Sequence, residues 1–483
     1  MSQSNSARLQ NDSTAAVHLG RQLVEAARAA QREYATFSQE RVDEVVTAVG
    51  WALIDPAHNR PLAEQADADT GLGNVADKIT KNHRKTLGLL RDLRGQRTVG
   101  IINDDPARGL VEIARPMGVV GAVVPSTNPV ATPFNKTLNA LKGGNAIILA
   151  PSPKGQQVCG RVVELVRAAL ERVGAPADLV QKLPEPVSKE TTYELMRQVD
   201  LVVVTGSQNN VRAAYSSGTP AIGVGAGNVP SIIDSSADLA DAAEKITASK
   251  SFDNATSCSS ENSVIILDDV YDAAVAALEG AGGRLLAADE KANLQQAMWP
   301  AGKLSPAVTA KAAPEIAQVA GLTRPELADA RFLMVEESGF GPDHPFADEK
   351  LSPVLAVYRA SDFTAAMAVV CNILEWKGKG HSVSIHTRDD DHVLRLGLEL
   401  PVCRVIVNQA HTFATGGNFD NAMPFSLSMG CGSWGGNSIS DNLNFRHFIN
   451  ITRIVRTTTR NEPSLEEIFG DFWRKHGITP DDR

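Results

Sequence analysis

One cysteine lies in a segment that is too polar for an ordinary protein core. Residues 251–262 read SFDNATSCSSEN, in which Cys258 stands among small polar residues, with Asp253 and Glu261 on either side. A thiol attacks a carbonyl carbon only as the thiolate, and a free cysteine has a pKa of about 8.5. Judged by its spacing alone, a cysteine of this kind is more often an inert buried thiol than a nucleophile. A loop position that opens into a cleft would favour nucleophilic catalysis.

A second candidate lies in the segment 123–144, VVPSTNPVATPFNKTLNALKGG. We expect a strand to end at Val124, a proline-rich turn to follow, and a helix to begin near Thr132. Asn128 lies on that turn, where its side-chain amide could donate a hydrogen bond to an oxyanion. Asn-Pro is also a common turn former. The residues themselves leave both interpretations open.

Two connections could lie under the phosphates of a nucleotide. In VVVTGSQNNVRAA, a strand leads through Thr205, Gly206 and Ser207 into a helix. Free N–H groups at a helix start attract phosphate, and glycine lets a phosphate approach the backbone closely. The glycine-rich segment AIGVGAGNVP, with Gly223 and Gly225, could line a cofactor or simply turn the chain. Neither segment is a GxGxxG motif, so each is a weak indication alone.

The elements around these residues alternate between strand and helix. Continuous apolar runs are typical of strands buried on both faces of a parallel sheet. Such runs occupy residues 120–125, 145–151, 200–206 and 230–234. Helical patterns separate them, and alternation of this kind predicts a doubly wound α/β domain that binds ligands at the carboxyl ends of its strands. The first hundred residues are predicted to be helical.

A second alternating region extends from about residue 262 to about residue 410. Cys258 therefore falls close to the seam between two α/β domains. Clefts at domain interfaces are preferred sites for small ligands.

Composition excludes several classes of function. The 483 residues carry a formal net charge of −9 and no long run of basic residues, which argues against a nucleic-acid partner. No apolar run approaches the roughly 20 residues that span a bilayer, so no membrane partner is expected. The five cysteines are scattered without metal-ligand spacing, so we expect no metal and no disulfide framework. These features predict a cytoplasmic protein.

Five segments together resemble one family. They are RPMGVVGAVVPSTNP, AAYSSGTPAIGVGAGNVP, SFDNATSCSSEN, FADEKLSPVLAVYRA and MGCGSWGGNSISDN, and they are similar to the CoA-acylating branch of the aldehyde dehydrogenase superfamily. The aldehyde-dehydrogenase half of bifunctional aldehyde/alcohol dehydrogenases resembles the chain closely, whereas no iron-dependent alcohol dehydrogenase half is present. The similarity covers nearly the whole chain in the same order. It implies an aldehyde dehydrogenase-like α/β fold with two Rossmann-type domains and a small β oligomerisation element.

The resemblance also implies a division of the chain. Residues 1–234 are expected to form the cofactor-binding domain, with 106–118 contributing to oligomerisation. Residues 235–420 are expected to form the catalytic domain. Residues 421–483 would return to the cofactor domain and add an oligomerisation strand and a C-terminal helix. ARGLVEIARPMG and FRHFINITRIVR are expected to pair across the subunits of a homodimer or homotetramer.

Catalytic roles follow from the same resemblance. Cys258 would attack the aldehyde and form a thiohemiacetal, whose oxyanion Asn128 and the Cys258 N–H would hold. Hydride transfer to the nicotinamide would leave a thioester on the enzyme. Glu349 would bind the nicotinamide ribose, although without the resemblance a solvated loop carboxylate is the preferred interpretation. The turn at Thr205, Gly206 and Ser207 would lie under the cofactor phosphates.

The acceptor of the acyl group is inferred from an absence. Hydrolytic relatives carry a glutamate in an E-L-G-G-K stretch, and here GVGAGN places Gly223 at that position. A general base must reach its proton directly or through one water, which glycine does not do. Coenzyme A is therefore the expected acceptor. His381 matches a histidine of acylating members and would lie near the CoA thiol or the substrate, or else be a structural histidine.

The cofactor and the aldehyde are inferred from charge. In APSPKG, Ser152 and Lys154 flank a proline at the position where NAD-preferring relatives often have a glutamate, so NADP is slightly favoured over NAD. Lys377, Lys379 and His411 would favour a small anionic aldehyde if they face the pocket, and are otherwise a solvated surface. Sulfoacetaldehyde is the leading substrate hypothesis, followed by succinate semialdehyde and acetaldehyde. A hydrolytic dehydrogenase and a non-enzymatic scaffold with the same fold are the alternatives.

Overall fold

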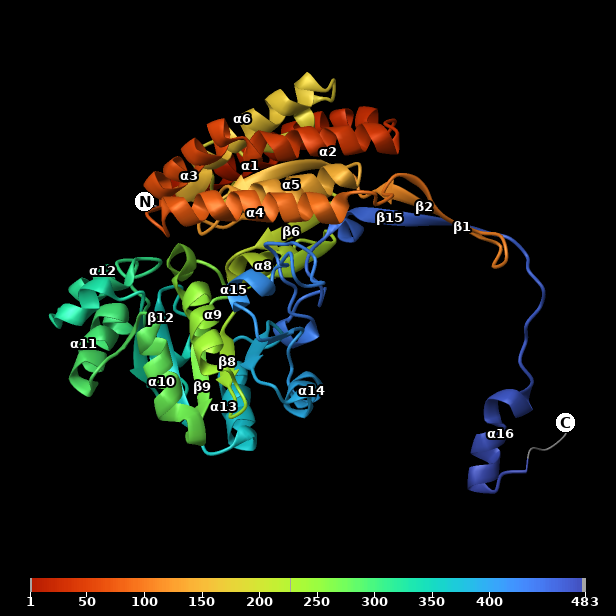
Figure 1. Cartoon of the computed structure of the whole chain (residues 1–483). Coiled ribbons are helices and arrows are strands. Elements are labelled where there is room, and N and C mark those ends of the chain that lie inside the picture. The colour runs from red at the N-terminus through yellow and green to blue at the C-terminus, as the bar shows by residue number, and fades with distance from the viewer. Residues whose placement is uncertain (1, 226, 480–483) are drawn as a thin grey trace.

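The computed structural model describes residues 2–225 and 227–479. Two α/β bodies, each built on a parallel sheet, lie one above the other in Figure 1, and a three-stranded arm extends from the upper body. The predicted α/β architecture with two Rossmann-type domains is confirmed. In the described part of the chain, no helix combines the length and the apolar character that crossing a bilayer requires.

Four helices open the chain, as the sequence pattern predicts. They are α1 (Ser2–Tyr34), α2 (Gln39–Ile54), α3 (Pro56–Thr70) and α4 (Val75–Leu93). Side-chain caps fix three of their starts: Ser38, Asp55 and Asn74 accept hydrogen bonds from the N–H groups of Arg41, Ala57 and Asp77. Such caps satisfy N–H groups that the first helical turn leaves free. The start of α4 matters most, because this helix lies beside the loop that carries Cys258.

The first body is a five-stranded parallel sheet in the order β5-β4-β3-β6-β7. Its strands are β3 (Val119–Val124), β4 (Ala146–Pro151), β5 (Val180–Lys182), β6 (Leu201–Thr205) and β7 (Ala221–Val224). The connecting helices are α5 (Ala131–Lys142), α6 (Gln156–Arg172), α7 (Lys189–Gln198) and α8 (Gln208–Tyr215). Every residue of β3 and β4 is buried, which explains their continuous apolar sequences.

The second body is a seven-stranded parallel sheet in the order β10-β11-β12-β9-β8-β13-β14. Its strands are β8 (Val229–Ile233), β9 (Glu261–Leu267), β10 (Gly283–Leu285), β11 (Phe332–Glu336), β12 (Val354–Ala360), β13 (Val383–His386) and β14 (Val405–Val407). The helices around it are α9 (Leu239–Ser251), α10 (Tyr271–Gly280), α11 (Ala288–Met298), α12 (Ala313–Val319), α13 (Phe363–Trp376) and α14 (Asp390–Glu399).

This sheet corrects one expected boundary. The cofactor-binding domain was expected to extend to residue 234, but β8 pairs with β9 and β13 of the second sheet. The chain therefore crosses to the second body between β7 and β8. The apolar run at 230–234 is a buried strand, as predicted, but the strand order assigns it to the other sheet.

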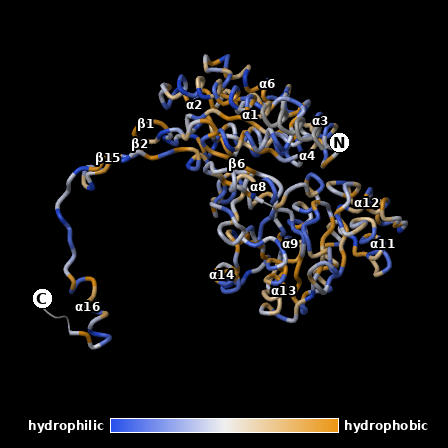
Figure 2. Tube along the Cα trace, turned by 180° about the vertical axis from the view of Figure 1, so that it is seen from behind, coloured by the Kyte–Doolittle hydropathy of each residue, from blue (hydrophilic) through white to orange (hydrophobic). Residues whose placement is uncertain are grey.

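The arm is an antiparallel sheet in the order β1-β2-β15. It contains β1 (Gly100–Asp105), β2 (Leu110–Pro116) and β15 (Ile449–Val455), with β15 and β2 in register from Ile449 opposite Pro116 to Val455 opposite Leu110. The two segments that were expected to pair across subunits thus pair within this chain. Beyond the arm, a mostly hydrophilic connection leads to α16 (Leu465–His476), which stands away from both bodies (Figure 2).

Before it reaches the arm, the chain crosses the two bodies again. The short helix α15 (His411–Ala414) follows β14, and the segment after it packs onto the first body. Phe425, Leu443 and Phe448 are fully buried in the core cluster of that body. This part of the C-terminal region therefore packs against the first body.

Candidate active site

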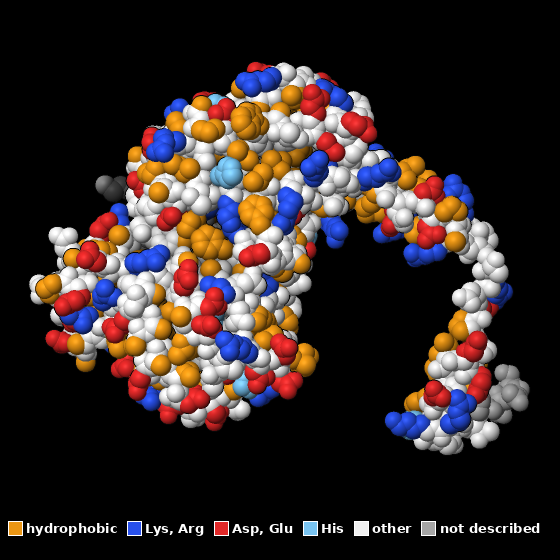
Figure 3. All heavy atoms as spheres, in the orientation of Figure 1, with side chains coloured by type: hydrophobic (Ala, Val, Ile, Leu, Met, Phe, Trp, Pro, Cys, Tyr) orange, Lys and Arg blue, Asp and Glu red, His pale blue; other side chains and the backbone are white. Residues whose placement is uncertain are grey.

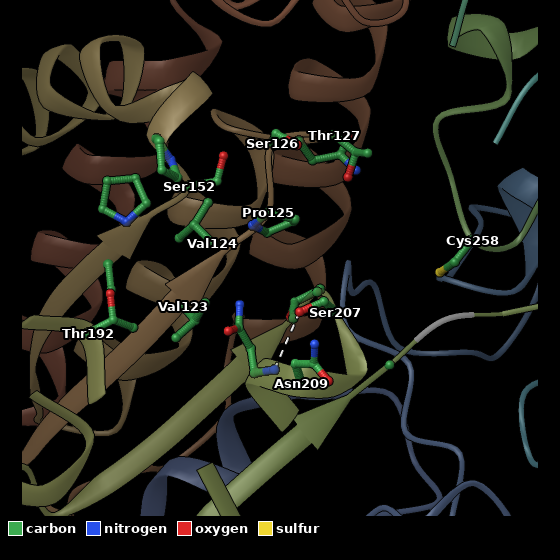
Figure 4. A pocket seen from close by; sticks show the side chains of 18 of the residues that line it. Val123, Val124, Pro125, Ser126, Thr127, Ser152, Thr192, Ser207, Asn209 and Cys258 are labelled. Carbon is green, nitrogen blue, oxygen red and sulfur yellow. Dashed lines mark hydrogen bonds between the residues drawn. The ribbon is translucent and has the colours of Figure 1, made fainter. Parts of the chain in front are cut away.

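Cys258 lies at one end of a cavity of about 800 Å³. The cavity lies where the loops after β3, β4 and β6 meet the loop of Cys258, at the carboxyl ends of the first sheet. In Figure 4, Ser152 and Thr192 lie at the side away from Cys258, and the side chain of Cys258 points into the space between. The strand order reverses between β3 and β6, and such a switch point is where doubly wound sheets bind ligands.

The loop before Cys258 is held in an unusual backbone conformation. Three consecutive residues without the freedom of glycine have positive φ angles: Asp253 at 49°, Asn254 at 50° and Ala255 at 56°. Such residues cost on the order of 1–2 kcal/mol each and persist only where surrounding contacts enforce them. Here the contacts come from the start of α4, because Asp253 accepts a hydrogen bond from the N–H of Asn74 and pairs with Lys78.

The Cys258 thiol is not activated by its resting surroundings. Burial raises the pKa of Cys258, and the neighbouring Glu349 carboxylate raises it further, whereas Arg404 acts in the opposite direction. Arg404 is 5% exposed and donates to the carbonyl oxygens of His381 and Gly430 at 3.2 and 2.9 Å. Its charge is therefore fixed beside the site, but burial has the larger effect on the thiol.

Asn128 lines the same cavity as Cys258. Its side-chain oxygen accepts a hydrogen bond from the ammonium group of Lys81 at 2.8 Å. The two residues come from different elements, Asn128 from the turn between β3 and α5 and Lys81 from α4. The structure therefore brings the amide that was predicted to bind an oxyanion to the nucleophile's cavity.

Glu349 also lines this cavity, and it is the single carboxylate among the described lining residues. One of its oxygens accepts a hydrogen bond from the N–H of Gly227 at 3.2 Å. Burial raises the pKa of Glu349 to about 8. A solvated loop carboxylate would show neither this burial nor this contact with the cavity.

The predicted phosphate turn is formed by Thr205, Gly206 and Ser207, all of which line the cavity. Ser207 caps α8 by accepting a hydrogen bond from the N–H of Asn210. Gly206 has a φ of 150° and faces open space, so a side chain here would be strained and would enter the cavity. The turn thus offers a helix start and an unobstructed backbone to a phosphate.

The structure corrects the role expected of Gly223. Gly225 lines the cavity, but Gly223 does not. A side chain at position 223 would point toward α8, since its β-carbon would lie 2.7 Å from Val211 and 3.3 Å from Tyr215. A glutamate at position 223 would collide with α8 rather than reach Cys258. The inference that the site lacks a base for activating water therefore depends on the number of carboxylates that line the cavity, and not on this glycine.

At the end of the cavity away from Cys258, Ser152 is a lining residue and Lys154 is exposed beside it without lining. Lys189 and Tyr193, from the start of α7, line the same cavity and were missed. A lysine at the first position of a helix reads as an ordinary surface charge, so the sequence contains no clear indication of this role.

The cations expected in the substrate pocket lie elsewhere. Lys377 pairs with Asp348 and Lys379 pairs with Glu375, both partly exposed and outside the lining of the Cys258 cavity. His411 is fully buried, with Nε2 2.9 Å from the hydroxyl of Ser382. These contacts correct the expectation that this set faces the aldehyde.

His381 is buried in the same network, with Nδ1 2.7 Å from the Ser382 hydroxyl, and it does not line the cavity. Burial, with Arg404, lowers the pKa of His381 to about 3, which keeps the imidazole neutral. Its ring approaches Gly227, which lies directly against the carbonyl of Cys258.

Four cations of α4, three of which lie near Cys258 or its loop, were not anticipated. Lys78, Lys81 and Lys85 are 5–7% exposed and Arg84 is half-buried. Lys78 and Lys81 pair with Asp253, whereas Arg84 and Lys85 have no carboxylate partner within 4 Å in the described structure. The stretch DKITKNHRK contains a detectable pattern, because lysines at positions 78, 81 and 85 share one helical face that lacks apolar residues.

A cysteine, an amide and a carboxylate around a cavity at the switch point of a parallel sheet are the groups expected of a cysteine-dependent dehydrogenase of the Rossmann class. The model of the aldehyde dehydrogenase family matches residues 3–327. Together with a relative that is 60% identical over 94% of the chain, this match shows that the chain belongs to the aldehyde dehydrogenase family. The resemblance read from the five motifs is confirmed.

The named relatives are acylating enzymes. The 60% identical relative, over 455 residues and 92% of its own length, is the acylating sulfoacetaldehyde dehydrogenase of Cupriavidus necator. The acetylating succinate-semialdehyde dehydrogenase of Clostridium kluyveri is 38% identical over 452 residues, covering 93% of this chain and 98% of that protein. Among solved structures, an acetylating aldehyde dehydrogenase from Geobacillus thermoglucosidasius superposes with a TM-score of 0.89 at 35% identity, covering 94% and 99% of the two chains.

Proposed function

We propose that this protein oxidises a small aldehyde to its acyl-CoA, with NAD(P)⁺ as hydride acceptor. The observation that carries the proposal is the composition of the cavity: a cysteine and an amide at one end, a phosphate turn along one wall, and a single carboxylate among the described lining residues. The similarity to acylating enzymes over nearly the whole chain supports the same reaction.

In the proposed reaction, the thiolate of Cys258 attacks the aldehyde carbon and forms a thiohemiacetal. The carbonyl oxygen becomes an oxyanion, which accepts hydrogen bonds from the Asn128 amide and from the N–H of Cys258. A bound NAD(P)⁺ would supply the hydride acceptor, and loss of the hydride from the thiohemiacetal carbon would leave a thioester on Cys258. The CoA thiolate then attacks the thioester carbonyl, and the sulfur of Cys258 leaves as the thiolate. Glu349 would hold the nicotinamide ribose beside Cys258.

The acyl group on Cys258 is expected to be transferred to a thiol rather than to water, because the cavity contains few groups that could act as a base. A hydrolytic enzyme needs a carboxylate that accepts a proton from the attacking water. Glu349 is the single described candidate in the lining, but its pKa of about 8 leaves it mostly protonated at neutral pH, and Gly227 occupies one of its oxygens. A thiol ionises more readily than water and is the stronger nucleophile.

His381 remains a proposed partner of the CoA thiol. Its Nε2 has no hydrogen-bond partner within the described structure, and its neutral ring lies beside Gly227. A neutral imidazole nitrogen that carries no hydrogen is able to accept a hydrogen bond from a thiol. Because the ring does not line the cavity, this role would require a small movement of Gly227 or of the ring when CoA binds.

We propose sulfoacetaldehyde as the aldehyde. The relative named for this substrate is 60% identical, against 38% for the relative named for succinate semialdehyde. A buried lysine near Cys258, outside the lining of the cavity, would suit an anionic substrate. Lys85 is buried, donates one hydrogen bond to the carbonyl of Gly416 at 2.6 Å, and has no carboxylate partner among the described residues. Burial lowers its pKa well below the usual range, and a bound sulfonate would restore its charge.

The test compares aldehydes with and without CoA. Wild-type enzyme should reduce NAD(P)⁺ with sulfoacetaldehyde only when CoA is present, and more efficiently than with acetaldehyde or succinate semialdehyde. Formation of the free acid at an equal rate without CoA would contradict acylation. No turnover with any of the three aldehydes would contradict the proposed reaction itself.

The contribution of Lys85 is tested by substitution. Hydrogen bonds to charged groups contribute about 1.5–3 kcal/mol, so Lys85→Met should lower kcat/KM for sulfoacetaldehyde relative to acetaldehyde by about 10- to 100-fold. The matched control is Lys379→Met, which removes a lysine paired with Glu375 at the surface and should leave the ratio unchanged. An unchanged ratio in Lys85→Met would place sulfonate recognition elsewhere.

We propose NADP⁺ as the preferred cofactor. A carboxylate that binds the ribose 2′-hydroxyl would repel a 2′-phosphate. The single carboxylate of the described lining, Glu349, hydrogen-bonds Gly227 beside Cys258 and not at the far end. Ser152 lines that far end, Lys154 is exposed next to it, and Lys189 also lines the cavity. A comparison of kcat/KM for the two cofactors checks this preference.

We also propose that the protein is a cytoplasmic homodimer or homotetramer, assembled through its arm. Strand β15 lies at the edge of the arm, and Val455 is 74% exposed. Figure 3 shows α16 beyond it, with hydrophobic side chains at the surface. Leu465, Ile468 and Phe472 of this helix are more than half exposed, which is unfavourable in an isolated chain.

A further inference from the structure

Lys81 is the one described residue whose side chain donates hydrogen bonds to both Asn128 and the loop of Cys258. We propose that Lys81 is a positioning residue, which orients the Asn128 amide and fixes its place relative to Cys258. The inference extends the proposed aldehyde oxidation, because it assigns the geometry of the oxyanion site to a residue that touches neither the substrate nor the nucleophile.

The contacts of Lys81 use its whole hydrogen-bonding capacity. Its ammonium group donates to Asn128 Oδ1 at 2.8 Å, to Thr256 Oγ1 at 3.1 Å and to a carboxylate oxygen of Asp253. An ammonium group has three N–H donors and no acceptor. The side chain is 7% exposed, so it has little freedom to exchange these partners for water.

The first consequence concerns the direction of the Asn128 amide. An asparagine side chain can rotate by half a turn, which exchanges its oxygen and its NH₂ group. Only the oxygen accepts a hydrogen bond from an ammonium donor, so Lys81 selects one of the two orientations. The NH₂ group of Asn128 is then directed away from Lys81 and makes no hydrogen bond to another described residue. An NH₂ group without a protein partner, on a residue that lines the nucleophile's cavity, is available to an oxyanion.

The second consequence concerns the distance between the two oxyanion donors. Asn128 belongs to the first body, whereas the N–H of Cys258 belongs to the loop before β9 of the second body. Lys81 contacts Asn128 on one side and Asp253 and Thr256 on the other. Thr256 in turn donates to Asp253 at 2.9 Å, which ties the loop together two residues before the cysteine. The same ammonium group therefore connects the elements that carry both donors.

The third consequence is electrostatic. In the buried group of Lys78, Lys81 and Asp253, one carboxylate faces two ammonium groups, and Asp77 accepts a hydrogen bond from the Asp253 N–H at 2.7 Å. Although burial acts to raise the pKa of Asp253, Lys81 and Lys78 hold it below its usual value, so the carboxylate stays ionised. An ammonium group that donates to an amide oxygen polarises the N–H bonds of that amide and strengthens them as donors.

Lys78 provides a matched comparison for the test. It lies one turn before Lys81 on α4, is 5% exposed, and pairs with the same Asp253 at 3.0 Å. Its described side-chain hydrogen bonds go to Asp253 and not to Asn128. Lys78→Met and Lys81→Met should therefore lower stability to a similar extent, and only Lys81→Met should affect oxyanion binding.

The experiment uses two reactions of Cys258 that differ in one respect. Acylation by p-nitrophenyl acetate passes through an oxyanion, whereas alkylation by iodoacetamide does not. Removing an oxyanion donor costs about 10²–10³-fold in rate, and misorienting one should cost about 10- to 100-fold. We expect Lys81→Met to slow acylation by this factor and to change alkylation by less than about threefold, with Lys78→Met near wild type in both. Turnover of the aldehyde should show the loss in kcat rather than in KM.

A double-mutant cycle with Asn128→Ala decides the mechanism. If Lys81 acts through Asn128, Lys81→Met should have little further effect on acylation once Asn128→Ala is present. Additive losses, or equal losses of acylation and alkylation, would overturn the proposal. Lys81→Arg, which keeps the charge and the donors, should recover part of the rate, and it replaces Lys81→Met if that variant does not fold. Because ester acylation needs neither cofactor nor CoA, it tests the inference even if aldehyde oxidation fails.

Discussion

The two sides of Cys258 differ in both space and charge. On the cofactor side lies a cavity of about 800 Å³, whose described lining contains one carboxylate and one lysine. On the side of α4, the space bounded by Lys78, Lys81 and Asn128 amounts to about 10 Å³. There the charges are buried and hydrogen-bonded to one another and to the cysteine loop (Figure 1 shows α4 spanning the upper body).

The difference separates two tasks that a covalent enzyme must perform. The cofactor side has to admit large partners in turn and release them, so it needs room and few fixed charges. The α4 side has to hold donors and a strained loop within a fraction of an ångström, so it needs buried contacts that leave no room. Substitutions on the two sides should therefore fail in different ways.

The largest effect is expected at the residue that both sides share. Cys258→Ala removes the nucleophile and should lower kcat by about 10⁴-fold or more, because no covalent intermediate forms. Turnover with sulfoacetaldehyde, CoA and NADP⁺ is the measurement. The control is Cys431→Ala, which removes a thiol that is 2% exposed and also lies near Glu349 and Arg404. Loss of activity in Cys431→Ala but not in Cys258→Ala would show that Cys431, and not Cys258, is the nucleophile.

A smaller effect, on stability, should separate the α4 side from the surface. Asp253→Asn leaves Lys78 and Lys81 buried without a counter-charge, and breaking a buried pair costs about 3–5 kcal/mol. The free energy of unfolding in denaturant should fall by that amount. Glu375→Gln, which breaks the exposed pair with Lys379, should change it by about 1 kcal/mol or less. Equal effects would mean that the α4 network does not hold the loop.

The sequence predicts the cavity side better than the α4 side. Strands buried on both faces appear as apolar runs, and the loops after them meet at one edge of a parallel sheet. Cys258, Asn128 and Glu349 consequently lie around one cavity, as the motifs imply. The roles of the three remain a proposal.

The α4 side depends on tertiary packing that a local pattern does not contain. Lysines on a helix are usually solvated, and only contact with Asp253, about 170 residues later, makes Lys78 and Lys81 part of the site. The prediction for Gly223 is wrong for a similar reason, since the packing of α8 decides where a side chain at this position would point. Lys377 and Lys379 look suitable by position, but neighbouring carboxylates neutralise them.

The smallest effect should appear on the cofactor side, as a change in pH dependence. Burial raises the pKa of Glu349 to about 8, so its carboxyl is mostly neutral at pH 7 and ionises as the pH rises past 8. The ionised form raises the pKa of the Cys258 thiol. In Glu349→Gln this opposing charge never forms. The rates of alkylation by iodoacetamide should therefore coincide below about pH 7, and above pH 8 the variant should react faster than wild type.

The same ionisation has a defined sign for stability. The folded protein binds this proton more tightly than the unfolded chain, so the contribution of Glu349 is largest below the ordinary carboxyl pKa and is lost as the pH rises toward 8. Glu349→Gln should remove this loss of stability with rising pH. For the alkylation rates the control is Glu337→Gln, which removes a buried carboxylate outside the cavity and should leave their pH profile unchanged. Coincident profiles for Glu349→Gln and wild type up to pH 10 would show that Glu349 does not act on the thiol. The cofactor side would then influence Cys258 only through the ligands it admits.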